Sequence, residues 1–158
     1  TMLSAKEMKS IADFLVSEQV SERVALEDQE SPQYQAVAWL SAEKEPEWTV
    51  PTAETNKHDV YLFKARYVMA LLKYALTDNS ENDWNIQLDF LSEKNICEWN
   101  GLDLDVKTGD ARETGVFCSQ VSNLPTGLYL GTYKITSFAK KTRDHRSLIP
   151  FFSFSRQE

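Results

Sequence analysis

The sequence predicts an α+β fold, with a helical part over about residues 4–92 and a small β part over about residues 93–158. In the first part, apolar residues recur at intervals of three and four, which is the period of an amphipathic helix. After Cys97, the stretch "LDLDV" alternates at every second residue, as a half-buried strand does. Helices first and short strands last is the order of an α+β protein.

The bulk composition is that of one ordinary folded domain. The chain has 158 residues, of which 42% are hydrophobic and 11% aromatic, and it has five Gly and five Pro. We therefore expect a single domain over residues 1–158 that is ordered nearly throughout. The formal net charge of -7 repels phosphates, so we expect neither nucleic-acid binding nor direct lipid binding. No apolar run approaches the about 20 residues that cross a bilayer.

Local signals place the first two helices. Ser4, with a Glu three residues later, has the spacing of a capping box and predicts a helix start. The polar stretch 20–30 is expected to be a connection with at most one turn of helix. Ser31 as the cap and Pro32 as the first helical residue predict the next helix, because Pro there loses no hydrogen bond. Trp39 is the largest side chain on the expected buried face of this helix.

A long helix is expected from Asp59, which should cap it, to Leu76. His58 is expected to be solvated. The loop before the helix contains Trp48, which no helical or strand period buries. We expect Trp48 either to fold back on the helices or to serve as an exposed interface anchor.

The remaining elements are shorter. A short helix over "DWNIQLDFL", residues 83–91, would complete a set of about four. After Cys97, "TGD" is a turn signal, and "GVFC" and "GLYLGTYKIT" have strand composition. The β part is therefore expected to be built from short strands joined by tight turns.

The two cysteines, Cys97 and Cys118, leave two alternatives open. A zinc site needs four ligands, and His58 and His145 show no metal-type spacing to the cysteines. Neither cysteine has the helix-start or basic setting that favours a reactive thiolate. From the residues alone, the pair is either a disulfide or two reduced thiols that pack as small apolar groups.

No motif indicates catalysis or a cofactor. The chain has no glycine-rich phosphate loop, no Gly-x-Ser-x-Gly elbow and no His-Glu-x-x-His run. Asp103 and Asp105 open a pattern like a calcium loop, but Thr108 stands where that loop needs Gly. We therefore expect no metal, no cofactor and no enzymatic activity.

A split motif in the β part resembles a known family signature. Its members are Cys97, Trp99, Gly101, Gly115, Val116 and Cys118. They resemble the Cys-x-Trp-x-Gly-Val-x-Cys signature of N-terminal cap segments in plant-type leucine-rich-repeat proteins, here divided by the insertion "LDLDVKTGDARET". The stretches "SPQYQAVAWL", "KARYVMALLKYAL" and "NDWNIQLDFLSEKN" resemble, in the same order, the cap of an algal-type group of these proteins. The resemblance implies a structural disulfide between Cys97 and Cys118, with Trp99 shielding the repeat core and Gly101 in a structural role.

The resemblance also implies that the C-terminal region forms the first coil of a repeat. "LYLGTYKI" fits the repeat pattern Leu-x-Leu-x-x-Asn-x-Leu, except that Tyr133 stands at the Asn position. One repeat length of 24 residues further on, Phe152 and Phe154 take the places of the first leucines. Because a coil is completed by its neighbour, we expect this β edge to meet a protein partner or a second copy. The expected interaction residues are Trp48, Leu128, Leu130, Tyr133, Phe151, Phe152 and Phe154.

The function expected from the sequence is that of a non-catalytic protein-interaction or capping domain, a structural subunit without a cofactor. The alternatives are an extrinsic subunit of a larger membrane-associated complex and a small enzyme of unrecognised type. An enzyme would be distinguished by a deep cleft with converging polar groups. A disulfide would imply an oxidising compartment, lumenal or extracellular.

Overall fold

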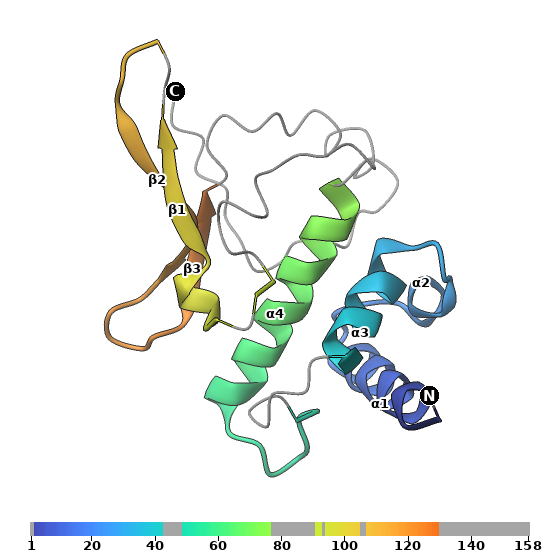
Figure 1. Cartoon of the computed structure of the whole chain (residues 1–158). Helices are drawn as coiled ribbons and strands as arrows, with labels where there is room; N and C mark the ends of the chain where they lie inside the picture. The colour runs from blue at the N-terminus through green and yellow to red at the C-terminus, as the bar shows by residue number, and fades with distance from the viewer. Residues whose placement is uncertain (1, 43–48, 77–90, 93, 105–106, 130–158) are drawn as a thin grey trace.

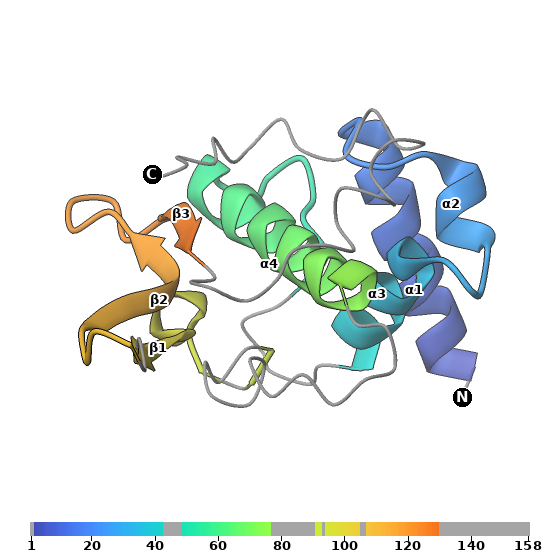
Figure 2. The same ribbon diagram turned by 90° about the horizontal axis from the view of Figure 1, so that it is seen from above.

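The structure is a computed structural model that describes residues 2–42, 49–76, 91–92, 94–104 and 107–129 (Figure 1). Within these residues, four α-helices precede a three-stranded antiparallel sheet, which confirms the predicted α+β class. Figures 1 and 2 show the longest helix between the other helices on one side and the sheet on the other. The predicted helix over 83–91 falls almost entirely outside the described residues.

The first two helices pack on the outer side of the bundle. Helix α1 spans Met2–Ser17, so Ser4 lies inside the helix and its predicted role as the start is wrong. Helix α2 spans Arg23–Glu27, slightly more than the single turn expected in the polar connection. The core side chains from these two helices are Ile11, Ala12, Leu15 and Leu26.

Helix α3, Pro32–Ala42, begins as its sequence predicts. The backbone N–H of Tyr34 donates to Oγ of Ser31 at 2.9 Å, so Ser31 satisfies a donor that the first turn leaves without a partner. Trp39 is only half-buried, because it stands beside the buried stripe and not on it. The stripe consists of Gln33, Ala36, Val37 and Leu40.

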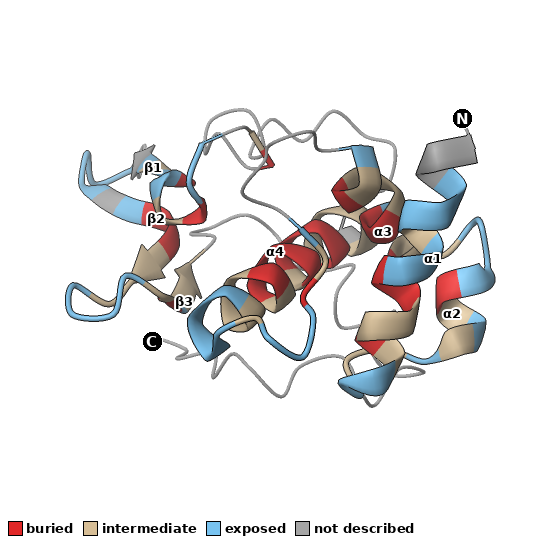
Figure 3. Ribbon diagram, turned by 90° about the horizontal axis from the view of Figure 1, so that it is seen from below, coloured by how far each residue is buried: buried red, intermediate tan, exposed pale blue. Residues whose placement is uncertain are grey.

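Helix α4, Lys57–Leu76, is the central element, and buried positions run along it (Figure 3). Its cap is Asn56, not Asp59. The Asn56 Oδ1 accepts from the Asp59 backbone N–H at 2.9 Å, and the Asn56 Nδ2 donates to the Asp59 carboxylate at 2.7 Å. Asp59 is therefore the third helical residue, and its carboxylate orients the capping amide of Asn56. The buried apolar residues of α4 are Phe63, Ala65, Tyr67, Met69, Ala70 and Leu71.

The β part begins with a short 3₁₀ helix, η1 (Ile96–Glu98), and continues as a meander. Strand β1 is Asn100–Leu104, β2 is Ala111–Cys118 and β3 is Pro125–Tyr129. The predicted "TGD" turn lies between β1 and β2, with Gly109 at φ 75°. The alternating pattern therefore predicts the first hairpin correctly.

The inner face of the sheet completes the helical core. Trp99, just before β1, and Val116, in the middle of β2, are fully buried in the same apolar cluster as the helix residues. Ile96 joins them from η1, and Leu128 of β3 packs against them. The sheet thus closes the end of the core that the helices leave open.

Tyr67 provides a test of this packing through pH. Its side chain is buried on α4, its hydroxyl lies 2.6 Å from Oγ of Ser21, and burial raises its pKa to about 12. The unfolded chain releases this proton near pH 10, so between about pH 10 and 12 the unfolded state is favoured as the pH rises. We expect this group alone to remove up to about 2.7 kcal/mol of stability by pH 12.

Urea denaturation of the wild type and of Tyr67→Phe across this pH range measures the effect. The substitution removes the titrating group, so the stability of the variant should fall less steeply above about pH 10. Burial also raises the pKa of Tyr61 and of Tyr74, and both proteins share those contributions. Equal slopes for the two proteins would show that the Tyr67 phenol is open to water.

Candidate interaction site

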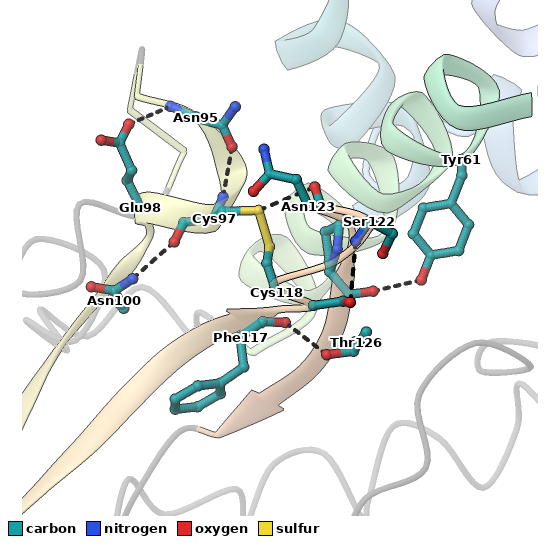
Figure 4. Close-up of a disulfide and its surroundings, with 12 residues drawn as sticks. Tyr61, Asn95, Cys97, Glu98, Asn100, Phe117, Cys118, Ser122, Asn123 and Thr126 are labelled. Atoms are coloured by element: carbon teal, nitrogen blue, oxygen red, sulfur yellow. Dashed lines mark hydrogen bonds between the residues drawn. A yellow bond between two sulfur atoms is a disulfide. The ribbon is translucent and has the colours of Figure 1, made fainter. Parts of the chain in front are cut away.

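The candidate site is the loop Ser119–Leu124, which joins β2 to β3 beside the disulfide (Figure 4). The site is built from the disulfide outward. Asn95 caps η1: its Oδ1 accepts from the Cys97 backbone N–H at 2.9 Å, and its own backbone N–H donates to the Glu98 carboxylate at 3.2 Å. This capping box fixes the backbone that carries Cys97.

Cys97 and Cys118 form a disulfide, with their Cα atoms 5.6 Å apart. The bond confirms the pairing that the family resemblance implies, and it favours an oxidising environment for the protein. The Cys97 sulfur also lies 3.6 Å from the carbonyl oxygen of Asn123. A disulfide sulfur carries no proton, so this is a packing contact between the bridge and the far side of the loop.

The loop is held closed at its base by its own hydrogen bonds. The Ser119 N–H donates to the Leu124 carbonyl at 2.9 Å, and the Asn123 N–H donates to the Ser119 carbonyl at 2.8 Å. The Ser119 hydroxyl accepts from the N–H groups of Val121 and Ser122, which is a local turn motif. Asn123 adopts φ 52°, a left-handed conformation that Asn tolerates better than most residues.

Helix α4 holds the same loop from the other side. The His58 Nε2 lies 3.1 Å from the Ser122 carbonyl, and the Tyr61 hydroxyl donates to the Pro125 carbonyl at 2.6 Å. The expectation of a solvated His58 is only partly right, because its side chain is half-exposed but bonds the loop, 64 residues away in sequence. One contact from α4 reaches the loop itself and the other reaches the first residue of β3, and together with the disulfide they restrict changes in the shape of the loop.

At the tip of this fixed loop, the side chain of Val121 is 97% exposed. None of the six residues from Ser119 to Leu124 carries a charge, whereas 26% of the whole chain is charged. Val121 therefore contributes almost nothing to the core, yet an ordered backbone presents it to solvent. An apolar side chain on a preformed loop loses little entropy when it binds, which is what an interface contact needs.

Three side chains from different segments pack together where the helices and the β part meet. Trp99 meets the half-buried Trp39 of α3 edge to face, with ring centroids 6.3 Å apart. On α4, Arg66 is 1% exposed; its guanidinium lies 5.2 Å from the centroid of the Trp99 ring, and Nη2 donates to the Lys94 carbonyl at 3.2 Å. Trp99 is thus the point where helices and sheet meet, and its shielding of a repeat core stays a prediction.

Of the predicted interaction residues, only Leu128 lies among the described residues. It is half-buried in β3 and packs against the core. The others, Trp48, Leu130, Tyr133, Phe151, Phe152 and Phe154, lie outside the described residues, so their role stays a prediction. Gly101 lies in β1 opposite Thr114, whose hydroxyl donates to its carbonyl at 3.3 Å.

Sequence reasoning missed Val121, Arg66 and the particular role of Gly115. Arg66 does carry a local signal, because the residues three and four positions away on α4 are all apolar and place it on the buried face: Leu62, Phe63, Met69 and Ala70. Val121 also carries a signal, since it is an apolar residue between a Gln and a Ser in a turn-rich stretch. Gly115 belongs to the split motif, but its conformation depends on a neighbouring strand.

Two further features of the described part of the chain bear on other kinds of function. No group of three or more His, Cys, Asp or Glu side chains there is placed to hold a metal ion. No described helix combines the length and apolar character of a membrane span. Compared with known proteins, the chain matches no family model, no curated sequence and no solved structure.

The disulfide itself leads to a prediction. Closing a loop between positions 21 residues apart should stabilise the fold by about 3 kcal/mol in the chain-entropy model. Reduction should therefore lower the midpoint of urea unfolding, and alkylation should modify both cysteines only after reduction. A variant with both Cys97→Ala and Cys118→Ala is the control, because a reductant should leave its stability unchanged. Alkylation of both thiols in fresh, unreduced protein would contradict the bridge.

Proposed function

We propose that the chain is a non-catalytic protein-interaction domain, comparable to the cap segment of leucine-rich-repeat proteins. In this proposal, the domain binds a protein partner through its loop Ser119–Leu124. The proposal is carried by one observation: Val121 is 97% exposed on a loop that the disulfide and helix α4 both hold in place. Binding residues are commonly found on loops fixed by a rigid scaffold.

The chemistry of the loop defines the partner. The loop offers one branched apolar side chain surrounded by uncharged amides and hydroxyls. A shallow apolar pocket with polar hydrogen-bonding groups at its rim matches that surface. The fold as a whole is acidic, so we also expect basic residues on the partner outside this pocket. The disulfide supports a lumenal or extracellular compartment for the interaction.

A capping role is supported by how the sheet closes the apolar core. Trp99 is fully buried where the helices and the sheet meet, and the same motif carries the disulfide. Such an arrangement would protect one end of a repeat core while leaving the loop free on the surface. The two parts of the proposal, sealing and binding, thus use different faces of the β part.

Matched substitutions test the binding loop. Val24 on α2 is 79% exposed and is the control for Val121, because both are exposed valines outside the core. Val121→Asp and Val24→Asp should both leave the midpoint of urea unfolding within about 0.5 kcal/mol of the wild type. Cross-linking in the native source, followed by mass spectrometry, should identify a partner with the wild type and with Val24→Asp. The same partner should be lost with Val121→Asp.

One result of this experiment would refute the binding role of the loop. If Val121→Asp retains every cross-linked partner in the amounts seen with Val24→Asp, the loop does not bind. A cleft with converging polar groups, or turnover of a substrate that survives both substitutions, would favour an enzyme instead.

A further inference from the structure

Within the described part of the chain, strand β1 has no partner on its outer edge. The sheet order is β1-β2-β3, so β1 pairs only with β2 among the described residues. The Val116 N–H donates to the Trp99 carbonyl at 2.8 Å, and the antiparallel register pairs Asn100 with Gly115. Because the direction of backbone groups alternates along a strand, those of Asn100, Leu102 and Leu104 point away from β2.

The exposed edge carries an apolar side chain at its centre. Leu102 is 66% exposed, and it lies in the middle of the five residues Asn100–Leu104. Figures 1 and 2 show the β1–β2 hairpin extending away from the helices, so its edge can be reached without a collision with the helical part. The strand contains neither Pro nor Lys, the residues that most often protect such an edge.

The sequence of β1 allows two copies of this strand to pair with each other in an antiparallel arrangement. If a two-fold axis passes through Leu102, this residue faces Leu102 of a second copy, and Asn100 faces Leu104 of that copy. Asp103 then stands across from Gly101, so no acidic residue of "NGLDL" is directly opposite another. In this register the outward backbone groups of three residues on each strand pair with one another.

We propose that two copies of this chain associate through their β1 edges, in an antiparallel pair centred on Leu102, to form one six-stranded sheet. The surface is separate from the loop Ser119–Leu124, so this dimer does not depend on the proposed function. One strand pair buries less surface than a stable interface does, so the dimer is weak and its population depends on concentration.

Sedimentation velocity of the full chain over a wide range of concentrations tests the proposal. The sedimentation coefficient of the wild type should rise from the monomer value towards the dimer value. Leu102→Lys places two cations opposite each other at the two-fold axis and should weaken association by about tenfold or more. Val24→Lys adds the same charge on α2 and should associate like the wild type. Leu102→Thr keeps the strand tendency and should weaken association less than Leu102→Lys.

Amide hydrogen exchange identifies the edge independently. The N–H groups of Leu102 and Leu104 should exchange more slowly as the wild-type concentration rises, whereas that of Val121 should not change. Leu102 is exposed, so circular dichroism is expected to show that its variants remain folded. A wild type that is monomeric at every concentration overturns the proposal, as does a dimer that Leu102→Lys leaves intact.

Discussion

Gly115→Ala is expected to destabilise the fold by about 2–6 kcal/mol. Gly115 has φ +105°, a conformation that residues with a side chain rarely adopt. A Cβ added there would lie 2.6 Å from the Cα of Asn100 and closer still to the Trp99 carbonyl oxygen. That carbonyl also accepts the hydrogen bond from Val116, so it cannot move without breaking the start of the β1–β2 ladder.

Gly127→Ala is the matched control for this substitution. Gly127 lies in the neighbouring strand β3, and an added Cβ meets nothing within 4 Å. Gly127→Ala makes the same chemical change and lowers the entropy of the unfolded chain by the same amount. Because the added Cβ meets no atoms, the free energy of unfolding should stay within about 1 kcal/mol of the wild type. Urea unfolding measures both variants, with limited proteolysis of the β part if Gly115→Ala does not fold. Equal stabilities would mean that β1 and β2 can separate locally at little cost.

The contrast between the two glycines shows what the sequence can predict. The alternation in "LDLDV" and the turn at Gly109 are local signals, so they are sufficient to predict the hairpin. The start of α3 is predictable for the same reason, because Ser31 and Pro32 act within one turn. A side chain is excluded at position 115 by the backbone of Trp99, which comes close to Gly115 only after the strands pair.

The shape of the candidate loop could not be predicted from the sequence either, because it also depends on residues far away in the chain. Its shape depends on His58 and Tyr61, which lie 64 residues before the carbonyls they contact. Periodicity correctly indicates that α4 has a buried face, but it does not tell which residues at the start of α4 reach the β part. The error at Asp59 is smaller: Asn and Asp both cap helices, and Asn56 lies three residues earlier.

The buried Arg66 is the clearest case of tertiary context overriding composition. A fully buried Arg is rare unless it is paired. The apolar neighbours of Arg66 on α4 indicate a buried position, but its charge favours the surface, and its partners come from other segments. Its guanidinium lies over the Trp99 ring, which offers the negative face of an aromatic quadrupole. The cost of removing Trp99 therefore includes what happens to this cation.

Trp99→Ala should cost about 3–5 kcal/mol, the range for loss of a buried large aromatic side chain. Trp99 is completely buried, contacts Trp39 edge to face and lies under the guanidinium of Arg66. The substitution leaves a cavity and takes the aromatic face away from a buried cation, so we expect the upper half of this range. Trp39→Ala should cost roughly half as much, because Trp39 is half-exposed.

A double-mutant cycle separates the contact between the two rings from the burial of each. The double variant should be more stable than the sum of the two single losses predicts, by about 0.5–1.5 kcal/mol, because the edge-to-face contact can be lost only once. Trp99→Phe keeps an aromatic face for Arg66 and should recover part of the loss, whereas Trp99→Leu fills space without that face. Urea unfolding of these variants at neutral pH measures the free energy of unfolding of each one, from which the coupling between the two rings follows. If Trp99→Ala costs no more than Trp39→Ala, the sheet does not close the core through Trp99, and the proposed sealing role is lost with it.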